Sequence, residues 1–207
     1  NSSPSKTPPS KPSPLSKDSD TSGLFDQSAL STLAQRLVEA AKRAGADAAD
    51  AVAVRGVSQG VEVREGRVEE SERSEGDDVG LRVLVGQRQA VVSTNDASGD
   101  AVTKLAERAV AMARVAPDDK YVGLADPALL ARDFPDLDLY DPWELAVDEA
   151  VALGRDAEAA ALAVDPRLTN TEGATVAWNE SEFVYANSHG FAGGYRSSRH
   201  HIDCAVI

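Results

Sequence analysis

The residues best suited to holding a metal ion lie near the end of the chain. His200, His201, Asp203 and Cys204 fall close together, and His189 precedes them. Imidazole, carboxylate and thiolate groups are the usual ligands of zinc. This stretch is predicted to be a β-strand, so at most one of His200 and His201 can share a face with Asp203. No CxxC or HExxH accompanies them, and we interpret the histidines as ordinary strand or interface residues.

A run of carboxylates in the middle of the chain is the next candidate for chemistry. Arg67 and Arg73 lie among or beside its six members, which are Glu69, Glu70, Glu72, Glu75, Asp77 and Asp78. Two carboxylates that act as acid and base need surroundings that separate their pKa values. A densely charged strand and turn does not provide that separation. We therefore predict a solvated face rather than a catalytic pair or a cation site.

The sequence does not support a nucleophile or a phosphate-binding loop. Ser188 and His189 are adjacent, which does not normally allow a hydrogen bond between their side chains, and no G-x-S-x-G motif is present. Residues 187–190 instead predict a tight hairpin turn with Gly190 at positive φ, and residues 170–173 predict another. No G-x-x-x-x-G-K-[ST] motif occurs, which excludes an ATPase within this segment. No residue is assigned a catalytic, cofactor-binding or metal-binding role.

Charge and composition limit the classes of partner. The 207 residues carry a net charge of −13 with a pI of about 4.6, and such a chain would repel a nucleic-acid backbone. The hydrophobic fraction of 42% can build a core, but no apolar run is long enough to predict a membrane span. The single cysteine excludes an internal disulfide, and no signal-peptide core is evident. We expect a cytoplasmic protein that binds neither nucleic acid nor membrane.

Residues 1–23 differ in composition from everything that follows. They are rich in Ser, Pro, Lys and Thr and have a net charge of +1, which leaves −14 for the rest of the chain. Such a segment offers little apolar surface to bury, so we predict a disordered arm. The chain begins with Asn1 and ends at Ile207 within an apolar run, and we therefore expect it to be part of a longer protein.

Apolar residues at spacings of three and four predict three helices. The first begins near Asp26 and ends before Gly45, which suits a helix C-terminus. The second begins at Ser98 and is closed by Pro117. The third begins near residues 141–144 and runs to about Val164.

Alternating apolar residues predict antiparallel strands between the first two helices. The expected meander has about five strands, with turns at 65–66, 76–78 and 86–87. Further strands are expected at 168–177, 182–186 and 195–207. The fold class is therefore α+β, with a helix-flanked antiparallel sheet whose other face, rich in Glu and Arg, is open. A second domain of helix and antiparallel strands begins after it.

The distribution of prolines sets the expected domain boundaries. We predict an N-terminal α+β domain at 24–116, a linker at 117–142 that contains four prolines, and a truncated second domain at 143–207.

The ordered motifs together resemble one protein family. The run GADAADAVAVRGVSQGVEVREGRVEESERSEGDDVGLRVLVGQRQAVVSTND is followed by PDLDLYDP, DPRLTNTEGATVAW and VYANSHGFAGGYRSSRHHIDCAVI. In this order they resemble the N-terminal half of the TldD/PmbA proteins, and specifically the PmbA (TldE) branch. The resemblance covers about Ala40 to Ile207 and leaves the first 23 residues outside.

The resemblance implies a cytoplasmic assembly of TldD and TldE subunits that acts as a zinc-dependent peptidase on unfolded or flexible peptides. TldD-type subunits carry the metal on an HExxxH helix, a motif that this chain lacks. The expectation is therefore no cofactor in this fragment, with zinc on a TldD-like partner subunit in a hetero- or homo-oligomer. We expect the strands at Arg67–Arg73 and Tyr195–His201 to form interface or channel lining.

Three functional hypotheses remain open at this point. The leading one is the N-terminal region of a PmbA/TldE-like subunit, which is not catalytic by itself and is required for a heteromeric metallopeptidase. The alternative is a non-enzymatic protein-binding or regulatory module. A self-sufficient peptidase is the third, and it would require an HExxxH motif beyond Ile207.

Overall fold

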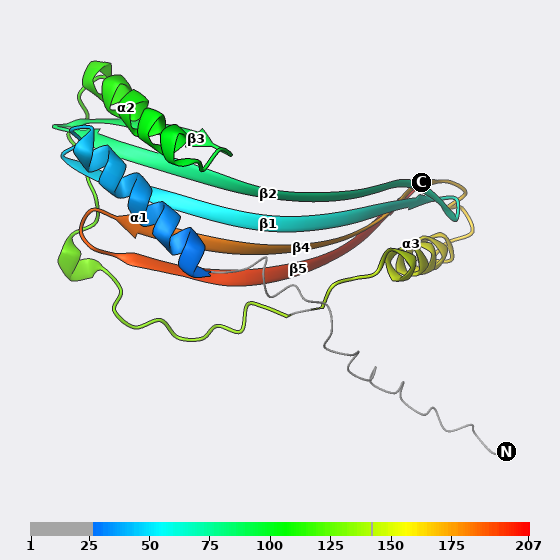
Figure 1. Cartoon of the computed structure of the whole chain (residues 1–207). Coiled ribbons are helices and arrows are strands. Elements are labelled where there is room, and N and C mark those ends of the chain that lie inside the picture. The colour runs from blue at the N-terminus through cyan, green and yellow to red at the C-terminus, as the bar shows by residue number, and fades with distance from the viewer. Residues whose placement is uncertain (1–26, 142) are drawn as a thin grey trace.

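The computed structural model describes residues 27–141 and 143–207, so the predicted disordered arm lies outside the described residues. The helices are α1 (Gln27–Arg43), α2 (Gly99–Val115) and α3 (Val147–Leu162), with a short 3-10 helix η1 at Pro127–Leu129. The strands are β1 (Ala48–Arg64), β2 (Arg67–Val85), β3 (Arg88–Thr94), β4 (Thr171–Asn187) and β5 (Ala192–Val206). This arrangement confirms the predicted α+β class, with helices beside an antiparallel sheet (Figure 1).

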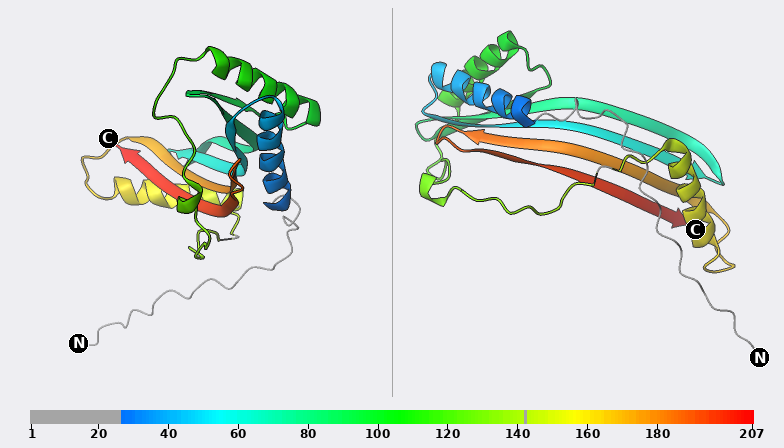
Figure 2. Two further views of the ribbon diagram at one scale, coloured as in Figure 1. Left: turned by 90° about the vertical axis from the view of Figure 1, so that its left-hand side faces the viewer. Right: turned by 60° about the horizontal axis from the view of Figure 1, so that its bottom comes forward.

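All five strands belong to one antiparallel sheet in the order β3-β2-β1-β4-β5. The strands β4 and β5 come from the predicted second domain, yet β4 pairs with β1 from Asp50 to Val63. The sheet is therefore continuous across the predicted linker, and the division into domains stays a prediction. Four of the strands are long, and Figure 2 shows them arching together along the length of the molecule.

The predicted five-strand meander was wrong, because residues 48–94 form three strands. The turn expected at 76–78 is absent, and Gly76 pairs directly with Gly56 in the middle of β1 and β2. Since β1 is bonded on both sides, by β2 and β4, its glycines are held extended by the two hydrogen-bond ladders. The hairpins at 65–66 and 86–87 are confirmed, with Gly66 at φ 72° and Gly86 at φ 59°.

Two predicted boundaries after the linker were also wrong. Residues 170–173 do not form a hairpin turn, because Thr171 already begins β4 and Gly173, at φ 106°, lies at a register shift inside this strand. A Cβ at Gly173 would lie 3.0 Å from the carbonyl oxygen of Val63, which explains the glycine. The third helix begins at Val147, later than predicted, since residues 143–145 contact the sheet instead.

The helices all cover the same face of the sheet. Alternate residues of β1 point to this helix face, first in the cluster with α1 and α2 and then in the cluster with α3. In Figure 1, α1 and α2 lie at one end of the strands and α3 near the other. The opposite face, here called the open face, has no helix on it among the described residues. This confirms the predicted sheet with one covered and one open face.

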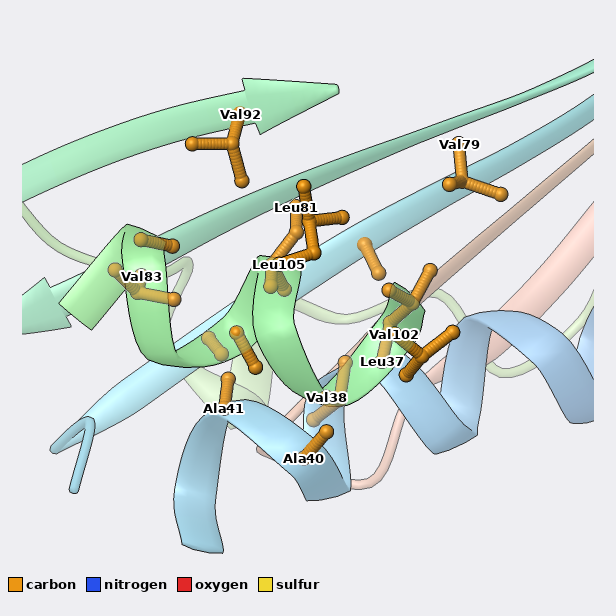
Figure 3. Close-up of a cluster of buried hydrophobic side chains, with 14 of the residues drawn as sticks. Leu37, Val38, Ala40, Ala41, Val79, Leu81, Val83, Val92, Val102 and Leu105 are labelled. Atoms are coloured by element: carbon orange, nitrogen blue, oxygen red, sulfur yellow. The ribbon is translucent and has the colours of Figure 1, made fainter. Parts of the chain in front are cut away.

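Two apolar clusters hold the helices on that face. The first cluster contains 23 buried residues from α1, α2 and the adjoining parts of the chain, and Figure 3 shows Leu81 of β2 close to Leu105 of α2 and Leu37 of α1 beside Val102 of α2. The second cluster contains seven: Val57, Val61, Val63, Leu145, Ala150, Val176 and Trp178. It is close-packed, because a Cβ at Gly154 of α3 would lie 2.9 Å from Cγ2 of Val63.

The segment between α2 and α3, here called the connector (residues 116–146), runs along the β5 side of the sheet (Figure 1). The N–H of Ser198 in β5 donates to the carbonyl oxygen of Leu139 at 3.0 Å, and the N–H of Asp141 donates to Oγ of Ser198 at 2.9 Å. The edge of β5 is thus partly capped by the chain itself.

Candidate functional site

A row of alternating charges crosses the helix face between the two apolar clusters. Asp77 of β2 lies opposite Arg55 of β1, Arg55 lies opposite Glu182 of β4, and Glu182 lies opposite Arg196 of β5. Directly opposed residues of antiparallel strands have neighbouring side chains. The register therefore places the charges −, +, −, + next to one another across four strands, and we call these four residues the charged row.

The charged row is partly withdrawn from solvent, and its charges are paired. Glu182 is only 1% exposed. Arg55 binds Asp77 through two parallel hydrogen bonds, with Nε 2.6 Å from Oδ1 and Nη2 2.7 Å from Oδ2. This hydrogen-bonded guanidinium lowers the pKa of Asp77 below its usual value. A buried carboxylate is costly unless it is paired, and the arginines on both sides of Glu182 supply the opposite charge.

The connector joins the row at its β5 end. Nε of Arg196 donates to Oε1 of Glu180 at 2.6 Å, and the ring of Tyr140 lies 3.8 Å from the guanidinium carbon of Arg196. Burial, followed by the negative charge of Glu180, raises the pKa of Tyr140 to about 12. Tyr140 therefore stays neutral at physiological pH and acts as a cover over the arginine.

Further contacts fasten the connector across the helix face toward α3. Trp143 stacks on His200 of β5 with ring centroids 4.5 Å apart. Glu144 accepts from Nη1 of Arg73 at 2.7 Å, and Nε2 of Gln59 donates to the carbonyl oxygen of Leu145 at 3.1 Å. These bonds and the charged row position the start of α3.

The open face has its own buried polar group near the first cluster. Asp50 is 7% exposed and binds Arg82 through both carboxylate oxygens. The hydroxyl of Tyr185 donates to Oδ2 of Asp50 at 3.1 Å. Burial is the main cause that raises the pKa of Tyr185 above its usual value.

A groove of about 880 Å³ opens beside Tyr185, between β4, β5 and the connector. Its walls are mostly apolar and aromatic, and it is lined by residues 134–140 with Phe183, Tyr185, Phe191, Gly193, Gly194, Tyr195 and Arg196. A smaller hollow of about 320 Å³ lies toward the other end of the open face. Its floor includes Gly60 and Ala177, and its walls include Glu70, Glu72 and His201.

The structure separates the histidines as the strand pattern predicted. His200 lies on the helix face against Trp143, whereas His201 lies on the open face with Nε2 2.9 Å from Oδ1 of Asp203. Cys204 lies on the helix face, like His200, because the two are four residues apart in the same strand. Within residues 27–141 and 143–207, no three His, Cys, Asp or Glu side chains come together as metal ligands. His201 and Asp203 alone do not fit the four-coordinate site of a zinc ion.

The acidic run is exposed, with one exception. Glu69, Glu70, Glu72, Glu75 and Asp78 are exposed, which confirms the predicted solvated character. Asp77 is the exception, because it belongs to the charged row. The strand also divides the run, with Glu70 and Glu72 on the open face and Glu75 and Asp77 on the helix face.

Ser188 and His189 lie in the β4–β5 turn, which confirms the predicted hairpin with Gly190 at φ 88°. Oγ of Ser188 accepts from the N–H of Ala49, and Nδ1 of His189 lies 3.0 Å from the carbonyl oxygen of Ala125. Their side chains thus bond to different parts of the backbone.

Sequence reasoning missed the charged row and the aromatic groove. Both depend on register, since Arg55 and Asp77 belong to one hairpin, Glu182 and Arg196 belong to another, and the two hairpins meet only once β1 is aligned with β4. A signal was present in the charges that interrupt apolar alternation in three strands, but it does not reveal which charge faces which.

Comparison with known proteins places the chain in a family. Residues 49–113 match the family model described as PmbA/TldA metallopeptidase domain 1, and residues 140–207 match the PmbA/TldA metallopeptidase central domain. Together the two matches cover more than half of the chain. This chain belongs to the PmbA/TldD family.

Similar proteins carry the same family name. The chain is 40% identical over 171 residues to "Metalloprotease PmbA homolog" of Haemophilus influenzae, covering 82% of this chain and 38% of that protein. It is 40% identical over 147 residues to "Metalloprotease PmbA" of Escherichia coli O157:H7, covering 71% and 33%. The chain is thus a PmbA/TldE-like protein that spans about a third of the length of these relatives.

Solved structures share the fold. A Bacteroides thetaiotaomicron protein, described as a candidate modulator of DNA gyrase, has a TM-score of 0.78 at 22% identity and covers 88% of this chain and 41% of its own. TldE from Thermococcus kodakarensis has a TM-score of 0.64 at 14% identity, with coverage of 84% and 39%. At these identities the likeness concerns the fold alone.

None of the described helices has the length and apolar character that crossing a membrane requires.

Proposed function

We propose that this chain is the N-terminal region of the non-catalytic, PmbA/TldE-like subunit of a two-subunit zinc peptidase that acts on unfolded or flexible peptides. Membership of the PmbA/TldD family and the metalloprotease names of the relatives support this assignment. In this proposal the zinc ion belongs to a TldD-like partner, and the present sheet contributes a surface for that partner and for the peptide.

The main support for the proposed contact surface is the long outer edge of β2. Strand β3 pairs only with Val79–Val85, whereas β2 begins at Arg67, so the outer edge of residues 67–78 has no neighbouring strand among the described residues. Such an edge presents backbone donors and acceptors to an extended segment. Its charged side chains discourage indiscriminate pairing and favour a partner of complementary charge.

Charge reversal on the open side of this edge tests the proposal. Glu70 and Glu72 are exposed on the open face, so Glu70→Lys with Glu72→Lys alters the surface and leaves the core intact. In the full-length protein we expect weaker co-purification with the TldD-like subunit and slower cleavage of an unfolded peptide. Glu107→Lys on the exposed side of α2 is the matched control. Unchanged assembly and peptide turnover in the double variant would show that this edge of β2 is not part of the proposed contact surface.

The β5 strand provides the second proposed contact region, and Arg199 is exposed on its open-face side. Arg199→Glu is expected to affect the same two measurements. If a partner is captured but zinc and peptide cleavage are absent from the assembly, the alternative of a non-enzymatic binding module is favoured instead.

A further inference from the structure

The groove on the open face is lined by six of the chain's aromatic side chains, which are Phe134, Tyr140, Phe183, Tyr185, Phe191 and Tyr195. Phe183 and Tyr195 stack with ring centroids 5.3 Å apart, and the ring of Phe191 lies 5.8 Å from that of Tyr185 and 5.9 Å from that of Phe134. Phe134 is 62% exposed and Tyr195 is 50% exposed. The groove therefore presents several aromatic rings side by side, with Phe134 and Tyr195 the most exposed of those on its walls.

A glycine keeps the space between these rings open. A Cβ at Gly193 would lie 3.1 Å from Cζ of Phe191 and 3.3 Å from Cζ of Phe134. Any larger residue would push the two rings or fill the gap between them. The groove is thus formed by the backbone of β5 as well as by the aromatic walls.

The rim of the groove is acidic on the connector side. Asp136 and Asp138 both line it, and Oδ1 of Asp136 accepts from the N–H of Asp138 at 2.9 Å. Aromatic ridges are the surfaces on which proline-rich segments dock, because the polyproline conformation needs no internal hydrogen bonds and loses little entropy on binding. An acidic rim favours a segment of this kind that also carries lysines.

We propose that this groove binds residues 4–17 of the same chain. Their sequence, PSKTPPSKPSPLSK, contains half of the chain's ten prolines and three lysines with no acidic residue. The charge of this segment is therefore opposite to that of the rim and to the net charge of −13 of the whole chain. Its prolines match the aromatic walls, and its lysines match Asp136 and Asp138.

The connection to α1 is long enough for this contact. Helix α1 begins at Gln27 and contacts both β4 and β5 on the helix face, and these strands form the floor of the groove on the other face. Residues 18–26 can span about 30 Å when extended. This is about three times the spacing of about 10 Å between stacked sheets.

A peptide added in trans tests the proposal. The full-length protein is prepared with residues 1–23 deleted. It is added in increasing amounts to a fluorescein-labelled peptide of residues 1–23, and binding is measured by fluorescence anisotropy. We expect saturable binding. The intact protein should bind the same peptide about tenfold more weakly, because its tethered segment competes at an effective concentration in the millimolar range. A peptide with all five prolines replaced by alanine should bind at least about tenfold more weakly than the parent peptide.

Groove variants locate the binding. Phe134→Ala with Tyr195→Ala, in the protein lacking residues 1–23, should weaken binding about tenfold or more, and both side chains are exposed enough for the fold to tolerate the change. Leu129→Ala, 80% exposed in the same connector but outside the groove, should bind like the parent. Binding that survives the double variant would overturn the proposal. The absence of binding at about 1 mM peptide would overturn it as well.

Discussion

The two apolar clusters share one face of one sheet, yet they are stabilised differently. The first cluster is large, is covered by both α1 and α2, and contains mainly Ala, Val and Leu. The second has seven buried residues under the single helix α3 and is surrounded by hydrogen bonds from polar side chains. Glu158 of α3 accepts from the N–H groups of Glu65 and Gly66 at 2.8 and 2.7 Å. The second cluster therefore combines a small apolar core with directed hydrogen bonds.

The charged row lies between the two clusters. It favours the observed register of β2, β1, β4 and β5, because a shift of one strand would separate the opposed charges. The row also holds Tyr140 and thereby sets the path of the connector to α3. The first cluster should thus contribute most of the free energy of unfolding. The second cluster and the charged row should mainly affect the local stability of α3 and of the strands beneath it.

The largest expected effect is a cavity in the first cluster. Leu81→Ala removes a fully buried side chain and should lower the free energy of unfolding by about 2–5 kcal/mol, measured by urea denaturation of the full-length protein. Val91→Ala on β3 is the control, because Val91 is 63% exposed and its loss should be nearly neutral. Equal effects of the two substitutions would contradict the assignment of the first cluster as the main core.

A smaller effect is expected where α3 approaches β1 most closely. Gly154→Ala should cost about 1–3 kcal/mol, because the new methyl group meets Val63 and this strain exceeds the gain in helix propensity. The loss should appear as faster amide hydrogen exchange throughout α3. Gly99→Ala at the start of α2, where the nearest atom is Nη2 of Arg36 at 3.5 Å, should slow or leave unchanged the exchange in α2. A protected α3 in the Gly154 variant would show that the close contact is not tight.

Removing the charge of Glu158, which accepts from two N–H groups of the β1–β2 hairpin, should have a more local effect on stability. Glu158→Gln keeps the shape of the side chain but removes its charge, and hydrogen bonds to a charged acceptor are the stronger ones. We expect the amides of Glu65 and Gly66 to exchange about tenfold faster, equivalent to about 1.4 kcal/mol. Asp156→Asn, exposed on the same helix, should not change them. If both variants behave alike, the carboxylate does not hold the hairpin.

The smallest effect concerns pH and the charged row. The pKa of Asp77 is lower in the folded protein than its ordinary value of 3.8, because Arg55 binds its carboxylate. The stabilisation is therefore complete above pH 3.8 and is lost as the pH falls through the lower, folded pKa. Because Asp77 is about a third exposed, the contribution should stay within about 1 kcal/mol. Asp77→Asn should unfold with a shallower dependence on pH below 4 than the parent, and identical profiles would show that the pair contributes nothing.

The sequence predicted local structure better than long-range register. The helices at 27–43 and 99–115, the hairpins at 65–66, 86–87 and 187–190, and the separation of His200 from His201 follow from periodicity and turn residues close in the chain. The uninterrupted β1 and β2 did not, because Gly56 and Gly76 resemble turn glycines until a pairing partner is known. The joining of β4 to β1, which also brings Arg55 beside Glu182 in the charged row, depends on pairs of residues more than a hundred positions apart in the chain, and no local pattern contains this information.

The central functional claim is that the zinc ion belongs to a partner and not to this subunit. The most direct measurement is native mass spectrometry with metal analysis of the full-length protein, alone and co-purified with a TldD-like subunit, followed by an assay with an unfolded peptide. We expect a metal-free, inactive protein alone, and one zinc ion per active pair. Stoichiometric zinc and peptide cleavage by the purified protein alone would contradict the account.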